Sequence, residues 1–252
     1  MRPLQTLYDD NNYQVALFPL QQLYISQGDT GTYSHDYSRY YATDCLGYIN
    51  GSRVYRCPCY APCDIELIWK DSTECCAMWK SLNPVHLSDN SISHIGIIIY
   101  HDNDIQNNTY YSIGTIKRQG EEFCKTGTGG NVTGDHVHIE IGKGIPNLSQ
   151  YRYHFLDSTD CKRIRIFNAL YINDTTIIQN WTGYTWKTFT GGHPSPTPES
   201  RKYRFKWVLY ARNLRDKRNV WHSFYFILIL NCKIKSTPFI FYLVTIYYLK
   251  RT

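Results

Sequence analysis

The sequence lacks an apolar run long enough to cross a membrane. Its C-terminal part contains two short runs, Phe224 to Leu230 and Phe239 to Leu249, of seven and eleven residues, whereas a membrane-spanning helix needs about 20. The N-terminus also lacks the apolar segment of a secretory signal, because Met1-Arg2-Pro3 soon leads into the polar stretch 9–12. We therefore expect neither a membrane span nor a secretory signal.

Methionine is scarce, with 2 residues among 252, whereas tyrosine is abundant, with 23. Aromatic residues favour strands, so this composition favours a β-rich protein with an exposed groove over a helical bundle. The sequence contains no internal repeats. Its length suffices for one domain with a hydrophobic core and an appendage.

Acidic residues are nearly absent from the C-terminal part. Residues 193–252 contain 12 Lys and Arg but only 2 Asp and Glu. This positive excess is larger than the formal net charge of the whole chain, which is +6. The change coincides with the Pro- and Ser-rich stretch 193–200, which is typical of a linker. We expect a folded domain over 1–192 and, over 193–252, a linker followed by an irregular, basic, aromatic tail. The tail's role stays open, and contact with an anionic membrane surface is one alternative.

The nine cysteines, an odd number, include no paired Cys-x2-Cys blocks. Cys57, Cys59 and Cys63 lie close together in sequence, and Cys75-Cys76 follow, but Pro58 and Pro62 interrupt the first group. A structural zinc site, a disulfide and unpaired thiols all stay open, and unpaired thiols are favoured. An oxidising compartment is required for the disulfide.

The stretch 127–144 reads GTGGNVTGDHVHIEIGKG. His136 and His138 are two residues apart in an alternating pattern that predicts a half-buried strand, so both imidazoles leave the same face. Val137 and Ile139 are expected to point into the core. One imidazole could then bind a metal while the other lies within reach of the metal-bound water. The four glycines before the strand predict a tight turn that lets the backbone pass close to a substrate.

This stretch resembles the signature of the lysostaphin-type (LytM-like) zinc metallopeptidases. In that family a turn of small residues precedes a Gly-x-His-x-His core, on a strand that ends in an acidic residue. The resemblance covers roughly residues 13–192. It implies a mainly β fold, in which a small antiparallel sheet forms the open, barrel-like groove of the duplicated hybrid motif.

The resemblance also implies a Zn²⁺ site formed by His35, Asp44 and His138. Many members of the family place the Asp four residues after the first His, whereas nine residues separate this pair; phage-type members have longer intervals. Asp36 is the competing choice. Adjacent residues on an extended chain point apart, and 41–47 has the pattern of a strand that delivers an inward Asp, so we prefer Asp44.

His101 and His136 are the catalytic histidines that the resemblance implies. The β-branched, apolar run 92–101 predicts a strand, and His101 lies where this strand opens into a polar loop. Together the two histidines orient the water, accept its proton and protonate the leaving amine; the sequence does not divide these roles between them. His86 and His94 are interpreted as surface or core-edge residues.

Three other segments fit the same family pattern. Residues 113–130 resemble its hairpin before the His-x-His strand, with Gly120 in the turn and Phe123 returning to the core. Ala61-Pro62 resembles its Ala-Pro turn, followed by a strand. Further on, the aromatic residues between 181 and 186 are interpreted as sheet packing.

The implied activity is that of a zinc metalloendopeptidase that cleaves the cross-links or stem peptides of bacterial peptidoglycan. The details most resemble phage lysins or tail-associated hydrolases, which a virion or a holin delivers to the cell wall. The alternatives are an N-acetylmuramoyl-L-alanine amidase and a non-catalytic wall-binding relative. Peptidoglycan is the expected partner, and no nucleic acid is expected. The bond cleaved, the target species and the oligomeric state are not specified by the sequence.

Overall fold

The computed structural model describes residues 1–30, 33–106, 111–150, 152–194, 225–226 and 244–245. The chain divides into two units, Met1–Ser195 and Pro196–Thr252. In the second unit, β16 (Tyr225–Phe226) pairs with β17 (Val244–Thr245) in antiparallel fashion. The rest of the tail's two apolar runs lies outside the described residues, and the expected domain boundary stays a prediction. Within the described part of the chain, no helix is long and apolar enough to cross a membrane.

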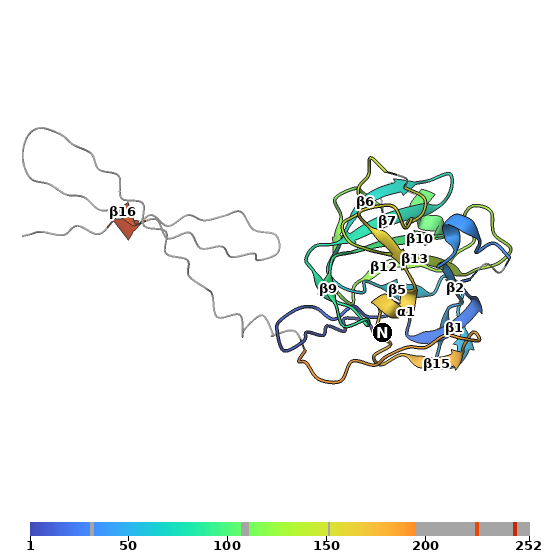
Figure 1. Cartoon of the computed structure of the whole chain (residues 1–252), viewed down its shortest axis with the longest axis horizontal. Helices are drawn as coiled ribbons and strands as arrows, with labels where there is room; N and C mark the ends of the chain where they lie inside the picture. Colours follow the sequence, from blue (N-terminus) through green and yellow to red (C-terminus); the bar gives the residue numbers. More distant parts are fainter. Residues whose placement is uncertain (31–32, 107–110, 151, 195–224, 227–243, 246–252) are drawn as a thin grey trace, which may run out of the picture. The chain divides into compact units, whose positions relative to one another are not determined.

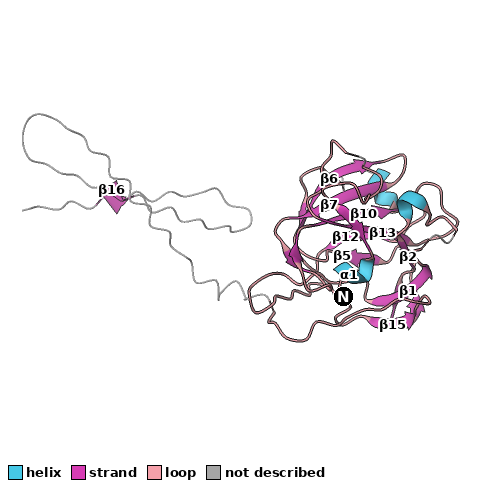
Figure 2. Ribbon diagram, in the orientation of Figure 1, coloured by secondary structure: helices cyan, strands magenta, loops and turns pink. Residues whose placement is uncertain are grey.

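Strands dominate the first unit, which confirms the expectation of a mainly β fold (Figure 2). The strands are β1 (Gln22–Gln27), β2 (Thr43–Cys45), β3 (Tyr48–Ile49), β4 (Ser52–Arg53), β5 (Pro58–Tyr60), β6 (Ile65–Asp71), β7 (Cys76–Ser81), β8 (Val85–His86), β9 (Ile92–Ser93), β10 (Ile95–Tyr100), β11 (Ile116–Lys117), β12 (Glu122–Lys125), β13 (Val137–Lys143), β14 (Lys162–Ile164) and β15 (Thr176–Gln179). The helices are the 3₁₀ turns η1 (Tyr37–Arg39) and η2 (Asn103–Gln106) and the single-turn α1 (Ile166–Ala169).

Nine of these strands form one sheet, which places β10 and β13 near its middle (Figure 1). The order is β11-β6-β7-β10-β13-β2-β1-β15, and β14 pairs with the end of β13. Neighbours are antiparallel except β1 and β15, which run parallel. β11 and β15 end the order and do not pair with each other in the described residues, so the sheet stays open, as expected.

The strand β13, which carries His138, is more deeply buried than the sequence predicts; His136 precedes it, in an isolated bridge with Gly127. Every residue from Val137 to Gly142 is buried, so the expectation of a half-buried strand is wrong. Val137 and Ile139 contribute to the core as expected. The opposite face, which carries His138 and Glu140, is covered as well, because other segments supply polar partners to these two side chains. Local alternation predicts which residues share a face, but not whether that face meets water.

The expected hairpin over residues 113–130 does not form. β11 pairs with β6, whereas β12 pairs with β5 in a separate two-stranded sheet. Residues outside this segment hold the turn between β11 and β12, since the Gly120 N–H donates to the Ala61 carbonyl and Arg118 forms an ion pair with Asp64. These contacts direct the chain away from the main sheet. Gly120 does lie in the turn, with φ of +83°, and Phe123 is buried as expected.

All eight described cysteines are buried free thiols; Cys232 lies outside the described residues. Within the described ranges, cysteine contributes neither a disulfide nor a metal-ligand group. Five of the thiols belong to the main hydrophobic core, which favours the interpretation of unpaired buried cysteines. Three aromatic side chains, Trp181, Tyr184 and Trp186, pack against the same core, as the sheet-packing interpretation predicts.

Candidate functional site

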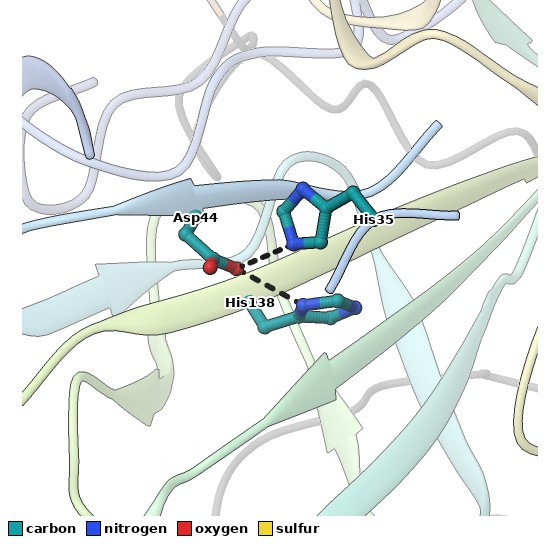
Figure 3. Close-up of side chains that lie close together, drawn as sticks. All are labelled: His35, Asp44 and His138. Carbon is teal, nitrogen blue, oxygen red and sulfur yellow. Dashed lines mark hydrogen bonds and ion pairs between the residues drawn. The ribbon is translucent and has the colours of Figure 1, made fainter. Parts of the chain in front are cut away.

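The register of the main sheet brings Asp44 and His138 together. In the antiparallel pair of β2 and β13, Asp44 lies directly opposite His138. Asp44 Oδ1 is 3.0 Å from His138 Nδ1 (Figure 3). All three residues of β2 are buried, so Asp44 lies on a short inward strand, as the sequence predicts. The separation of the two side chains is therefore set by backbone pairing.

His35 reaches the same carboxylate from the segment that joins β1 to β2. Its ring is fully buried, and its Nε2 lies 3.2 Å from Asp44 Oδ1. One ligand atom from each of His35, Asp44 and His138 lies within 4.8 Å of the other two, so these residues could hold a metal ion. We name these residues the His-Asp-His group. Asp36, the competing residue, is exposed and precedes η1.

The electrostatics of this group favour a cation. Burial raises the pKa of Asp44, but hydrogen bonds with His138 and His35 outweigh it and hold that pKa well below its usual range. Burial also disfavours charge on His138, yet its hydrogen bonds with Asp44 and Glu140 raise its pKa to about 9. Two buried carboxylates flank one imidazole here. The negative charge of two buried carboxylates requires a compensating positive charge, which a proton or a metal ion can supply.

The donor atoms also fit a metal ion. The carbonyl of Gly28 lies 2.7 Å from His35 Nδ1 and accepts a hydrogen bond from this nitrogen. The lone pair of the ring is then on Nε2, the nitrogen that lies near Asp44. Two imidazole nitrogens and one carboxylate oxygen are a common ligand set for zinc. The geometry thus brings together the three residues that the sequence nominated as ligands.

His101 and His136 lie beside this group. Their ring centroids are 4.6 Å apart, and His136 Nε2 is 3.5 Å from Asp44 Oδ2. Each ring is held at Nδ1 by a backbone carbonyl 2.9 Å away, that of Gly129 for His101 and that of Gly134 for His136. The two imidazoles therefore present Nε2 for further interactions. Burial lowers the pKa of His101 to about 4, so this ring is neutral at pH 7.

The glycine-rich turn makes room for His101. A Cβ at Gly127 would lie 2.1 Å from the His101 carbonyl oxygen, and one at Gly129 would lie 2.7 Å from Cys75 Sγ. The His101 carbonyl accepts the N–H of Gly129. His101 itself has φ of +80°, a left-handed conformation that is costly for a residue with a Cβ. The close approach that these glycines allow is thus to the backbone of His101.

His86 and His94 lie elsewhere. His86 Nδ1 is 2.8 Å from Asp9 Oδ2, and His94 Nδ1 is 3.2 Å from Ser81 Oγ. Both rings are partly buried. Neither belongs to the His-Asp-His group, in keeping with their interpretation as surface or core-edge residues.

Sequence reasoning missed three residues that adjoin the site. Glu140 Oε1 is 3.1 Å from His138 Nε2 and 2.7 Å from His154 Nδ1, and His154 Nε2 is 3.3 Å from Arg39 Nε. Burial raises the pKa of Glu140, but its hydrogen bonds with His138 and His154 prevail and lower that pKa to about 2. The alternation His-x-His-x-Glu signals Glu140. No local pattern signals Arg39 or His154.

No family model matches the sequence. The chain is 31% identical over 176 residues to morphogenesis protein 1 of Bacillus phage B103, an alignment that covers 69% of this chain and 44% of that protein. The chain thus spans less than half the length of this curated relative.

Two solved structures show weaker similarity. A zinc-containing peptidase from Vibrio cholerae is 14% identical, with a TM-score of 0.33 and coverage of 53% of this chain and 39% of that one. The deep-sea M23 metalloprotease pseudoalterin is also 14% identical, with a TM-score of 0.38 and coverage of 61% and 76%. The chain is therefore similar in sequence to part of a phage morphogenesis protein, and more distantly similar in fold to two peptidases.

Proposed function

We propose that this chain is a zinc-dependent peptidoglycan hydrolase, a metalloendopeptidase that cleaves stem peptides or cross-links. The observation that carries the proposal is the convergence of His35, Asp44 and His138 within 4.8 Å, with two further histidines beside them. These residues come from distant parts of the sequence. A merely structural role accounts poorly for four histidines around one buried carboxylate.

In the proposed enzyme His35 Nε2, Asp44 Oδ1 and His138 Nδ1 hold Zn²⁺. Three protein ligands are typical of a catalytic zinc site, whereas structural sites usually have four. When bound, Zn²⁺ lowers the pKa of a coordinated water to about 7 and polarises the scissile carbonyl.

The two neighbouring histidines supply proton transfer. His101 is neutral and presents Nε2, so it is suited to accept a proton from the attacking water and to deliver it to the leaving amine. His136 also presents Nε2, on the Asp44 side of the site, and is suited to the same proton transfer. Once it has accepted a proton, its Nε2–H would donate a hydrogen bond to the oxygen of the scissile carbonyl as that oxygen gains negative charge. Their Nδ1 bonds to backbone carbonyls hold both rings in place before substrate binds.

Peptidoglycan is the proposed substrate because the stretch 127–144 resembles the lysostaphin-type signature, whose members cut peptidoglycan. The similarity to a phage morphogenesis protein supports a phage source. A phage enzyme of this type reaches the cell wall from the virion or through a holin.

Mass spectrometry of digested peptidoglycan tests the proposal. New free amines on peptide fragments are the expected products of an endopeptidase. A freed lactyl carboxyl group would instead identify an amidase, and the absence of any product with zinc-loaded protein would identify a binding protein. Digestion in the presence of a chelator, followed by addition of Zn²⁺, determines whether the activity depends on the metal.

A further inference from the structure

A buried chain of hydrogen bonds leads from His138 to an arginine. Glu140 Oε1 lies 3.1 Å from His138 Nε2 and 2.7 Å from His154 Nδ1. His154 Nε2 lies 3.3 Å from Nε of Arg39. Glu140 and His154 are only 4% and 5% exposed. The polar atoms of Glu140 and His154 therefore depend on their protein partners, because water has little access to them.

The arginine fixes the direction of every bond in the chain. A guanidinium group donates and never accepts, so His154 Nε2 must accept from Arg39. A neutral imidazole that accepts at Nε2 donates from Nδ1, and the Glu140 carboxylate accepts that hydrogen bond. The other oxygen of Glu140 accepts the backbone N–H of Phe155 at 3.3 Å. Both oxygens of Glu140 thus accept hydrogen bonds, and Oε1 lies 3.1 Å from His138 Nε2, so His138 donates to it from this nitrogen.

The consequence falls on the opposite nitrogen of His138. With Nε2 committed to Glu140, the imidazole can coordinate a cation only through Nδ1. This is the atom 3.0 Å from Asp44 Oδ1. His35 uses the other nitrogen, since its Nδ1 is committed to the Gly28 carbonyl. His138 therefore presents Nδ1, and His35 presents Nε2, to the same candidate metal position beside Asp44.

Arg39 also connects the two halves of the site. It belongs to η1, which follows His35 in the connection between β1 and β2. Its guanidinium lies 5.6 Å from the centroid of the Tyr100 ring, and the Tyr100 hydroxyl donates to the Tyr153 carbonyl at 2.6 Å. These contacts hold the arginine against β10. The segment that supplies His35 is thereby tied to β10, where Tyr100 pairs with His138 of the neighbouring strand β13.

We propose that Glu140, His154 and Arg39 are positioning residues that hold His138 in the Nε2–H tautomer, with its Nδ1 lone pair directed at the metal ion. This proposal rests on the proposed function in that it assumes a bound Zn²⁺, but not on any particular substrate. Carboxylate partners of metal-ligating histidines orient the ring and raise its basicity, and their loss typically weakens metal binding about 10- to 100-fold.

The first test measures Zn²⁺ affinity of the full chain by competition with a chromophoric chelator. His154→Phe removes the hydrogen bonds of the ring with Glu140 and Arg39, and we expect it to weaken binding about 10- to 100-fold. His154→Gln keeps an amide donor for Glu140 and an acceptor for Arg39, so it should restore most of the affinity. His86→Phe is the matched control, because it removes another histidine–carboxylate pair, with Asp9, outside the His-Asp-His group. It should bind Zn²⁺ as the wild type does.

A second variant covers the case in which His154→Phe fails to fold. Arg39 is only half-buried, so Arg39→Met is expected to fold and to weaken Zn²⁺ binding severalfold, less than His154→Phe. The tautomer is read directly from long-range ¹H–¹⁵N spectra of zinc-loaded protein labelled at histidine. We expect a proton on Nε2 of His138 in the wild type, and a weaker or exchange-broadened signal in the two variants.

Unchanged Zn²⁺ affinity in both His154→Phe and Arg39→Met would overturn the positioning role, and so would a proton on Nδ1 of His138 in the zinc-loaded wild type. Failure of the proposed function gives a different pattern. If peptidoglycan is not cleaved but the variants still weaken Zn²⁺ binding as described, the function is wrong and the positioning role holds. A wild-type chain that does not bind Zn²⁺ contradicts both.

Discussion

Asp44 and His138 face each other across the β2–β13 ladder, and Asp44 Oδ1 lies 3.0 Å from His138 Nδ1. Both side chains are at least nine-tenths buried, at 9% exposure for Asp44 and 6% for His138. Two of the three proposed ligands thus lie on paired strands and only His35 comes from a connecting segment. A site built on paired strands is held more accurately than one built on loops. This difference leads to distinct expectations for the individual residues.

Substitutions in the His-x-His pair should separate metal binding from catalysis. We expect His138→Ala to abolish both Zn²⁺ retention and lysis, because it removes a proposed ligand. His136→Ala should keep the metal and lose activity, by about 10²- to 10⁴-fold if its proton-transfer role holds. Metal content after dialysis and turbidity of a cell-wall suspension are the measurements. Equal loss of metal in the two variants would contradict the assigned roles.

The choice between Asp44 and Asp36 is tested by the same charge-neutralising change at both positions. Asp44→Asn should weaken Zn²⁺ binding by more than about tenfold, the lower bound for loss of even an indirect partner of a metal. Asp36 is exposed and outside the His-Asp-His group, so Asp36→Asn should leave the affinity unchanged. Titration with Zn²⁺ measures both. The reverse ranking would show that the ligand had been assigned to the wrong carboxylate.

The metal-free protein should lose stability as the pH rises from about 6.5 to about 9. The pKa of His138 rises from 6.5 to about 9, because the hydrogen bonds with Asp44 and Glu140 overcome burial. A group whose pKa is higher in the folded state stabilises it fully below the unfolded pKa, and this contribution disappears as the pH passes the folded pKa.

Bound Zn²⁺ replaces the proton, so the zinc-loaded protein should lack this loss and take up metal more tightly as the pH rises. Melting temperatures of chelator-treated and zinc-loaded protein between pH 6 and 9 measure the effect. Parallel pH profiles of the two forms are the result that this explanation does not permit.

The glycine-rich turn offers a matched pair of substitutions. In Gly127→Ala the new methyl group would meet the His101 backbone oxygen at 2.1 Å, whereas at Gly134 a Cβ has no atom within 4 Å. We expect Gly127→Ala to cost about 1–3 kcal/mol of stability, as overpacking does, and to lower activity by displacing His101. Gly134→Ala should stay within about 0.5 kcal/mol of the wild type. Denaturant unfolding and lysis assays compare the two, and equal effects would refute the crowding argument.

The cysteines should be unreactive in the folded chain. Burial raises the pKa of the Cys57, Cys76 and Cys161 thiols to about 12, so the thiolate that reacts with alkylating and disulfide reagents is scarce at pH 8. A colorimetric thiol assay should detect at most one thiol per native chain, that of Cys232, and all nine after denaturation without a reductant. Fewer than nine thiols in the denatured chain would reveal a disulfide.

The sequence by itself determined the features that depend on neighbouring residues. The alternation around His136 and His138 fixes that these side chains share a face and that Val137 and Ile139 enter the core. The apolar run before His101 fixes a strand, although the structure divides it at His94 into β9 and β10. Local sterics and side-chain periodicity suffice for such conclusions.

Only the tertiary structure decided which distant segments meet. It opposed Asp44 to His138, paired β11 with β6 and β12 with β5, and covered the polar face of β13 with His154 and Arg39. Strand register and the burial of a face depend on the packing of the whole sheet, to which residues far apart in sequence contribute together. No window of the sequence contains that information, and this is why the partners of Glu140 had to come from the fold.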